Sequence, residues 1–143
     1  MTGGDGAFVH IDQDEPQYQF TSYVFSNYRR STDGGATWSN IDFSNSIGQF
    51  INPTDYDDGN NKMYTSAAAG QYIRWENPQT GGTFTPITIA AFNSSTVRSV
   101  SVSPYTSNRV FFGTAGGRIA KVENANLAVP TGTDLTGTGM PTS

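Results

Sequence analysis

A short polar stretch in the first third of the chain reads Ser31-Thr32-Asp33-Gly34-Gly35-Ala36-Thr37-Trp38. The carboxylate of Asp33 can accept backbone N–H groups within such a turn, and glycine readily adopts the positive φ that tight hairpin turns need. The ring of Trp38 would then pack on the strands that the turn joins. The pattern S-x-D-x-G-x-T-W therefore predicts a hairpin that is locked by its own side chains.

Short runs of alternating, β-branched and aromatic residues lie on both sides of this turn and continue along the chain. The predicted strands are Ala7–Ile11, Tyr18–Val24, Tyr28–Ser31, Thr37–Phe43, Gln49–Ile51, Lys62–Ser66, Tyr72–Trp75, Phe84–Ile89, Val97–Ser103, Arg109–Gly113 and Arg118–Glu123. Helical periodicity is nearly absent, and Gly-rich turn clusters separate the runs. The pattern predicts an all-β fold of short antiparallel strands.

The strands recur as three similar units. Each unit opens with an apolar residue, a small polar residue and then Pro or Gln, continues with an aromatic-bearing strand, and ends with a strand that carries a basic residue. The openings are Ile11-Asp12-Gln13, Ile51-Asn52-Pro53 and Val102-Ser103-Pro104. Four short strands in about 40–50 residues is the spacing of a β-propeller blade.

The repeats predict three four-stranded antiparallel blades, at residues 5–46, 47–93 and 94–136. A closed propeller ring takes about four to eight blades. We therefore expect a partial ring, either as a segment of a larger propeller or as a unit whose copies associate to cover the open ends.

The motif resembles the Asp-box of BNR-repeat propellers at five positions: Ser31, Asp33, Gly35, Thr37 and Trp38. In that family the Asp-box is structural and lies on the blade rim, away from the central pocket. The opening Gly3-Gly4-Asp5-Gly6 and the following Ile11-Asp12 look most like the secreted glycosyl-hydrolase-like and sortilin-like propellers of gliding bacteria. This resemblance implies a bacterial protein that works outside the cell or at its surface, although the chain shows no signal peptide.

The composition excludes several classes of function. With 12 acidic and 8 basic residues, the chain has a net charge of −4, which disfavours binding to nucleic acid. The sequence contains no apolar run of the ~20 residues that membrane insertion requires. Cysteine is absent, so no disulfide or thiolate metal site can form. No cofactor-binding motif is present.

Catalysis has only weak candidates. A glycosidase needs two carboxylates about 5–10 Å apart, and the first strands and the loops that precede them would line the central pocket of a propeller. Asp5 and Asp12 are the carboxylates best placed for this role. A turn-forming role explains Asp5 more simply, and a strand-end cap that bonds the following loop explains Asp12.

Aromatic residues are the remaining functional signal, because Tyr and Trp rings stack on sugars and anchor protein interfaces. If their rings are exposed, the candidate ligand-binding residues are Tyr56, Tyr72 and Trp75. The favoured alternative is that most of the aromatic residues lie on strands and pack between blades. The acidic run from Asp55 to Asn61 could supply oxygen ligands to calcium, but its Gly59 falls where a ligand is needed, so a solvated hairpin loop is the favoured interpretation and no metal site is predicted.

Three functions remain open. The leading hypothesis is a non-catalytic structural or binding module of a secreted or cell-surface propeller, with glycan or extracellular protein as its ligand. The second is part of a sialidase- or xyloglucanase-like glycoside hydrolase with catalytic carboxylates partly outside this chain. The third is a self-associating scaffold of open propeller segments.

Overall fold

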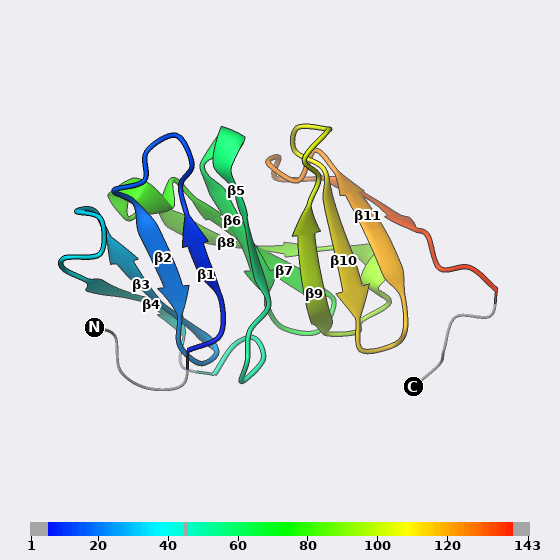
Figure 1. Ribbon diagram of the computed structural model, residues 1–143. Helices are drawn as coiled ribbons and strands as arrows, with labels where there is room; N and C mark the ends of the chain where they lie inside the picture. The colour runs from blue at the N-terminus through cyan, green and yellow to red at the C-terminus, as the bar shows by residue number, and fades with distance from the viewer. Residues whose placement is uncertain (1–5, 45, 139–143) are drawn as a thin grey trace.

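The computed structural model describes residues 6–44 and 46–138, and it is built almost entirely of β-strands (Figure 1). The strands form three four-stranded antiparallel sheets, as the sequence predicts. Blade 1 comprises β1 (Val9–Ile11), β2 (Gln19–Ser22), β3 (Ser26–Ser31) and β4 (Ser39–Ser44). Blade 2 comprises β5 (Thr54–Asp57), β6 (Lys62–Ser66), β7 (Gln71–Glu76) and β8 (Thr83–Thr88). Blade 3 comprises β9 (Val97–Val102), β10 (Val110–Thr114), β11 (Ile119–Glu123) and β12 (Thr131–Asp134).

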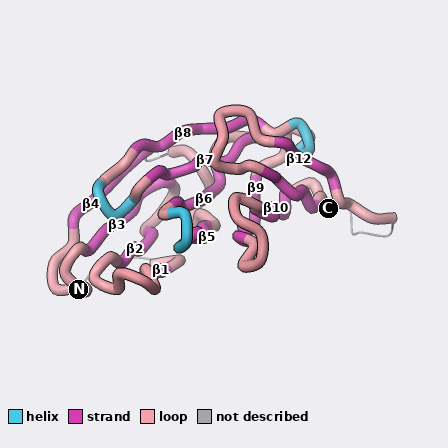
Figure 2. The backbone as a smooth tube through the Cα atoms, turned by 90° about the horizontal axis from the view of Figure 1, so that it is seen from above, coloured by secondary structure: helices cyan, strands magenta, loops and turns pink. Residues whose placement is uncertain are grey.

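Within each blade the strands follow one another in space as they do in sequence. Figure 2 shows the three sheets fanned along an arc, with β1, β5 and β9 on the inner side and β4, β8 and β12 on the outer side. Three 3-10 helices of one turn each lie in the connections: η1 (Asp58–Asn60), η2 (Pro78–Thr80) and η3 (Ala90–Phe92). This is the architecture of adjacent blades in a β-propeller.

The second and third strands of the three blades share one register. Gln19 pairs with Ser31, Met63 with Trp75, and Val110 with Val122, in each case across the same two strands. The matching positions Gln19, Met63 and Val110 are therefore spaced 44 and 47 residues apart.

Two buried clusters hold the blades together, because successive residues of a strand face opposite sides of its sheet. Phe20 and Tyr28 of blade 1 pack on Met63 and Trp75 of blade 2. The opposite face of blade 2 packs on blade 3 in a larger cluster. The members of that cluster are Tyr64, Tyr72, Ile87, Ile89, Phe92, Val97, Val110, Phe112, Ala120, Val122 and Ala125.

The strand predictions differ from the structure at one predicted strand and at two strands that were not predicted. Gln49–Ile51 is not a strand, because the buried side chain of Asn52 accepts the Gln49 N–H at 3.0 Å and folds the segment into a turn. The first strand of blade 2 is instead β5, which the sequence assigned to a solvated loop. The sequence also missed β12, whose four residues are all exposed and carry no alternating pattern.

The structure also changes which residue of blade 2 is equivalent to Asp12, which the sequence aligned with Asn52. Cross-strand pairing places Ile11, Tyr56 and Val102 at matching points, opposite the second strands. The residues that follow them are Asp12, Asp57 and Ser103, so Asn52 does not share this position.

Candidate functional site

The connections that follow the three inner strands meet at one edge of the molecule, at the top of Figure 1. They are the connections β1–β2, β5–β6 and β9–β10, and together we call them the inner-loop rim. The backbone N–H of Gln13 donates to the Asp58 carboxylate at 2.6 Å and joins the first two connections. The amide of Asn60 donates to Ser107 Oγ at 3.1 Å and joins the second to the third. The rim is therefore continuous across all three blades.

A cleft of about 560 Å³ opens in this rim between blades 2 and 3. It is lined by Gln13, by residues 55–60 and by residues 102–107. The sequence expectation was a pocket at the inner strands and the connections before them. The cleft instead lies where β5 and β9 end and the connections after them begin.

The cleft is lined by carboxylates, which give it negative charge. Its lining includes Asp55, Asp57 and Asp58, and no Lys or Arg. Ion pairs outside the cleft join the carboxylates of Glu76, Glu123 and Asp134 to the cations Lys62, Arg74, Arg109, Arg118 and Lys121. The cleft is thus suited to a positively charged ligand.

Each of these carboxylates also shapes the cleft. Asp55 accepts the Val102 N–H at 2.7 Å, which fixes β9 against β5. The two carboxylate oxygens of Asp57 accept from the Asn60 amide nitrogen at 2.9 and 3.1 Å, and the same nitrogen donates to Ser107 Oγ. The bonds to Asp55 and Asp57 are charge-assisted and hold the wall in one conformation before any ligand arrives.

Asp12 lies beneath the rim and connects blade 1 to blade 2. One carboxylate oxygen accepts the Glu15 N–H at 2.8 Å, as expected of a strand-end cap. The other accepts the Tyr56 hydroxyl at 2.8 Å and the Gln79 amide at 3.1 Å. Burial, followed by this bond and by the charges of Asp12 and Asp58, raises the pKa of Tyr56. The phenol therefore stays a neutral donor and anchors the cleft wall.

The candidate catalytic carboxylates do not form a pair among the described residues. Asp12 is 1% exposed, and both its oxygens are engaged in the bonds just described. Asp5 lies outside the described residues.

The structure separates the candidate ligand-binding aromatics. Tyr56 is half-buried and lines the cleft. Tyr72 and Trp75 are fully buried, so they cannot bind a ligand at the surface, and the alternative that strand aromatics pack between blades holds for both. Both lie on the central β7, where a neighbouring blade covers each face of the sheet. In contrast, Tyr105 in the β9–β10 connection is 95% exposed and lines the cleft.

The turn from Ser31 to Trp38 joins β3 to β4 and lies outside the cleft. Asp33 accepts the Thr37 N–H at 2.8 Å and the Ser31 hydroxyl at 2.7 Å. Gly34 and Gly35 have positive φ, and the indole of Trp38 donates to Gly35 O at 3.0 Å. These hydrogen bonds all lie within the turn, so they stabilise the hairpin and do not reach the cleft.

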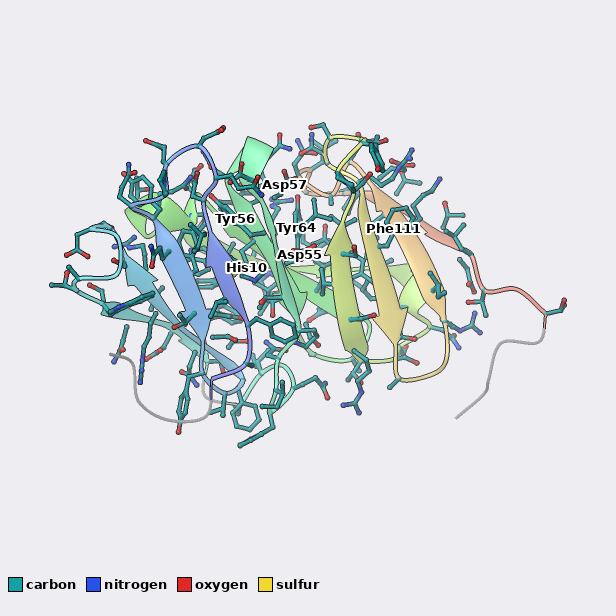
Figure 3. All side chains as sticks on the ribbon, viewed as in Figure 1. His10, Asp55, Tyr56, Asp57, Tyr64 and Phe111 are labelled. Carbon is teal, nitrogen blue, oxygen red and sulfur yellow. The ribbon has the colours of Figure 1, made fainter. Side chains whose placement is uncertain are left out.

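His10 points from β1 toward β5, near Tyr56 and Asp55 (Figure 3). Its Nε2 lies 2.8 Å from Thr54 Oγ1, and burial lowers the pKa of the imidazole against the opposing effect of the Asp55 charge. Within the described part of the chain, no group of three or more His, Asp or Glu side chains is arranged to hold a metal ion. No helix there is long and apolar enough to cross a membrane.

Sequence reasoning missed the cleft because it took residues 55–61 as one loop. The signal was present in the density of aspartates from Asp55 to Asp58, and in the isolated Tyr105 beside Pro104. Neither pattern shows that the two segments, nearly 50 residues apart, face each other.

No protein-family model and no curated protein sequence matches this chain. Solved structures with the same arrangement are β-propellers. The β-propeller domain of Cps50 (Swd1) from Myceliophteria thermophila superposes with a TM-score of 0.68 at 9% identity, over 94% of this chain and 40% of that one. An ancestral GH74 enzyme gives a TM-score of 0.68 at 16% identity, over 93% of this chain and 18% of that one.

A third similar structure is YCF48 bound to D1 peptide, with a TM-score of 0.62 and 16% identity, over 96% of this chain and 41% of that one. At these identities the likeness establishes the fold alone. The chain spans less than half the length of these three structures. Fold and comparisons together define the described chain as three adjacent blades of a β-propeller.

Proposed function

We propose that this chain is the ligand-binding part of a non-catalytic propeller protein, and that its cleft binds an extended, positively charged segment of another protein. The observation that carries the proposal is the lining of the cleft, which contains three aspartates and no Lys or Arg. Carboxylates at the mouth of a low-dielectric cleft attract cationic side chains and speed their encounter. Tyr105 adds an exposed ring on which a cation or an apolar side chain can pack.

The fold agrees with this role, since loops at one edge of a rigid β-scaffold commonly carry binding residues. Among the similar structures, YCF48 was solved bound to a peptide. The S-x-D-x-G-x-T-W turn further supports grouping the chain with the Asp-box propellers. That grouping favours a secreted or cell-surface bacterial protein as the context.

A glycan is the second candidate ligand, and the exposure of Tyr105 favours it. Tyrosine rings stack on sugar faces, while the neighbouring carboxylates and hydroxyls could accept and donate bonds to sugar hydroxyl groups. The hydroxyl-bearing residues of the lining are Ser103, Thr106 and Ser107.

Fluorescence anisotropy with short labelled peptides tests the first candidate. A peptide rich in Lys should bind the chain, and a peptide with Glu in place of each Lys should not. Binding should weaken as salt is added, because the attraction acts between partly exposed charges. Asp58→Asn keeps the acceptor for the Gln13 N–H but removes the charge, and should weaken binding about two- to fivefold.

Asp42→Asn is the matched control, since this exposed carboxylate on β4 does not line the cleft. It should leave the affinity unchanged. Equal binding of the Lys and Glu peptides, or an unchanged affinity in Asp58→Asn, would contradict the cationic ligand. Binding of neutral oligosaccharides that is insensitive to salt and lost in Tyr105→Ala would instead support the glycan.

A further inference from the structure

Each blade presents an aromatic residue beside a cation on the face that looks toward the next blade, which we call its forward face. Cross-strand pairing joins Phe20 to Arg30 in blade 1 and Tyr64 to Arg74 in blade 2. The same pairing joins Phe111 to Lys121 in blade 3. The three pairs occupy matching positions in the shared register.

In the first two blades this pair forms the contact with the next blade. Arg30 Nη1 donates across the interface to Pro78 O at 3.1 Å. Arg74 Nη1 donates to Ala125 O at 3.0 Å and to Leu127 O at 2.6 Å. In both cases the acceptor belongs to the connection between the third and fourth strands of the next blade.

The acceptors occupy matching positions as well. Trp75 of blade 2 and Val122 of blade 3 occupy equivalent positions in the shared register. Pro78 lies three residues after Trp75, and Ala125 lies three residues after Val122. The matching residue of blade 1 is Gly34, three residues after Ser31. Gly34 is exposed in the turn between β3 and β4.

Blade 3 keeps the forward-face pattern, but no described blade covers it. Phe111 (labelled in Figure 3) and Lys121 alternate with Val110, Phe112, Ala120 and Val122, which pack on blade 2, so the two side chains point to the opposite face. Ile119 is 39% exposed at the position that the buried Tyr28 and Tyr72 hold in the other blades.

The corresponding face of blade 1 is open, and it exposes two apolar side chains. Val9 and Ile11 are 73% and 55% exposed there. The equivalent residues of blade 3 are Val100 and Val102. Both are partly buried and pack on the cluster between blades 2 and 3.

Elsewhere this face of blade 1 is more polar than in the other blades, with Gln19 and Ser31 at the positions of Met63 and Trp75. The adjacent turn carries the carboxylate of Asp33, opposite in charge to Lys121, whose ammonium group also pairs with Glu123 Oε1 of its own blade at 3.1 Å.

We propose that the forward face of blade 3 binds blade 1 of a second copy of this chain, head to tail, with the Lys121 ammonium donating to the carbonyl of Gly34. The contact repeats the bond from a cation to a backbone carbonyl that already joins blades 1 and 2 and blades 2 and 3. It is heterologous, so it either closes into a ring or extends as an open chain of copies. This inference does not depend on the cleft or its ligand.

Light scattering on the full chain, over a wide range of protein concentration, tests the contact. The mass should rise with concentration, to a fixed multiple if the ring closes and without limit if it does not. Lys121→Gln should raise the concentration needed for association about tenfold, because it removes a charge from a desolvated interface. Lys121→Arg should preserve association, since arginine stands at both matching positions.

Lys62→Gln is the matched control, because it removes the other lysine of the chain, which lies on blade 2 away from the open faces. It should leave association unchanged. A chain that stays monomeric at every concentration overturns the proposal, as does association that Lys121→Gln leaves unaltered.

Disulfide trapping gives a second, independent measurement, because the chain contains no cysteine. A mixture of the single variants Ile119→Cys and Ala36→Cys, which keeps Lys121 in place, should form a mixed disulfide under mild oxidation, because Ile119 is exposed on the same face as Lys121. Ala69→Cys, exposed in the β6–β7 connection, replaces Ala36→Cys as the control and should cross-link much more slowly. Equal rates for the two mixtures would contradict head-to-tail docking.

Discussion

At the residue scale, Asp33 shows how one carboxylate stabilises a turn. The Thr37 hydroxyl donates to the carboxylate at 2.6 Å, and the Thr37 N–H and the Ser31 hydroxyl also donate to it. These bonds lower the pKa of Asp33 from 3.8 to about 2, and the bond from the Thr37 hydroxyl has the largest effect. The ionised form is therefore favoured in the folded hairpin.

This lowered pKa makes part of the stability dependent on pH. The carboxylate binds a proton more readily in the unfolded chain, so its contribution is present above the unfolded pKa of 3.8 and is lost as pH falls toward about 2. We expect the melting temperature of the native chain to fall more steeply over this interval than that of Asp33→Asn. Asp14→Asn, an exposed carboxylate of the β1–β2 connection, should follow the native chain. Parallel curves for the native chain and Asp33→Asn would contradict this assignment.

At the element scale, two tryptophans secure the connection between the third and fourth strands of their blades. The indole of Trp38 donates to Gly35 O at 3.0 Å, and that of Trp75 donates to Gly81 O at 2.8 Å. Their surroundings differ, because Trp38 is half-buried whereas Trp75 is fully buried and stacks on Phe84 with ring centroids 4.8 Å apart.

We expect the two alanine variants to differ in their loss of stability. Trp75→Ala leaves a cavity between blades 1 and 2 and should reduce the free energy of unfolding by about 3–5 kcal/mol. Trp38→Ala loses a partly solvated ring and should cost about 1–2 kcal/mol. Urea unfolding followed by circular dichroism measures both values. Equal losses would show that burial between the blades does not set the contribution of these rings.

At the scale of the whole molecule, stability should be greatest where two blades cover a strand and least at the open ends. β10 and β11 contribute Val110, Phe112, Ala120 and Val122 to the largest buried cluster. In contrast, all four residues of β12 are exposed at the sheet edge.

Hydrogen exchange measures this gradient directly, since amides in the core open only with large unfolding events. We expect the slowest exchange in the central strands β6, β7, β10 and β11, and the fastest among strand amides in β12 and in the short β1. Uniform protection across the three blades would indicate that the chain unfolds as one cooperative unit despite its open ends.

The positions that sequence reasoning placed well depend on local chemistry. Side-chain alternation predicts the second and third strands, and the recurring basic residues Arg30, Arg74 and Lys121 align with the observed register. The glycines and the carboxylate of the Ser31–Trp38 stretch predict a turn between the third and fourth strands. Both signals are set by neighbours within a few residues, so the all-β class and the repeat follow from the sequence alone.

Only the tertiary structure decided which side chains are buried and which segments meet. The sequence leaves open whether Tyr72 and Trp75 are exposed or pack between blades. Each faces a neighbouring blade, and the alternation of β7 does not reveal that both sides of the sheet are covered. The cleft joins Asp55–Asp58 to the loop with Tyr105, through contacts between residues nearly 50 positions apart. Local patterns report how a strand or turn forms, whereas burial and the cleft depend on how whole blades stack.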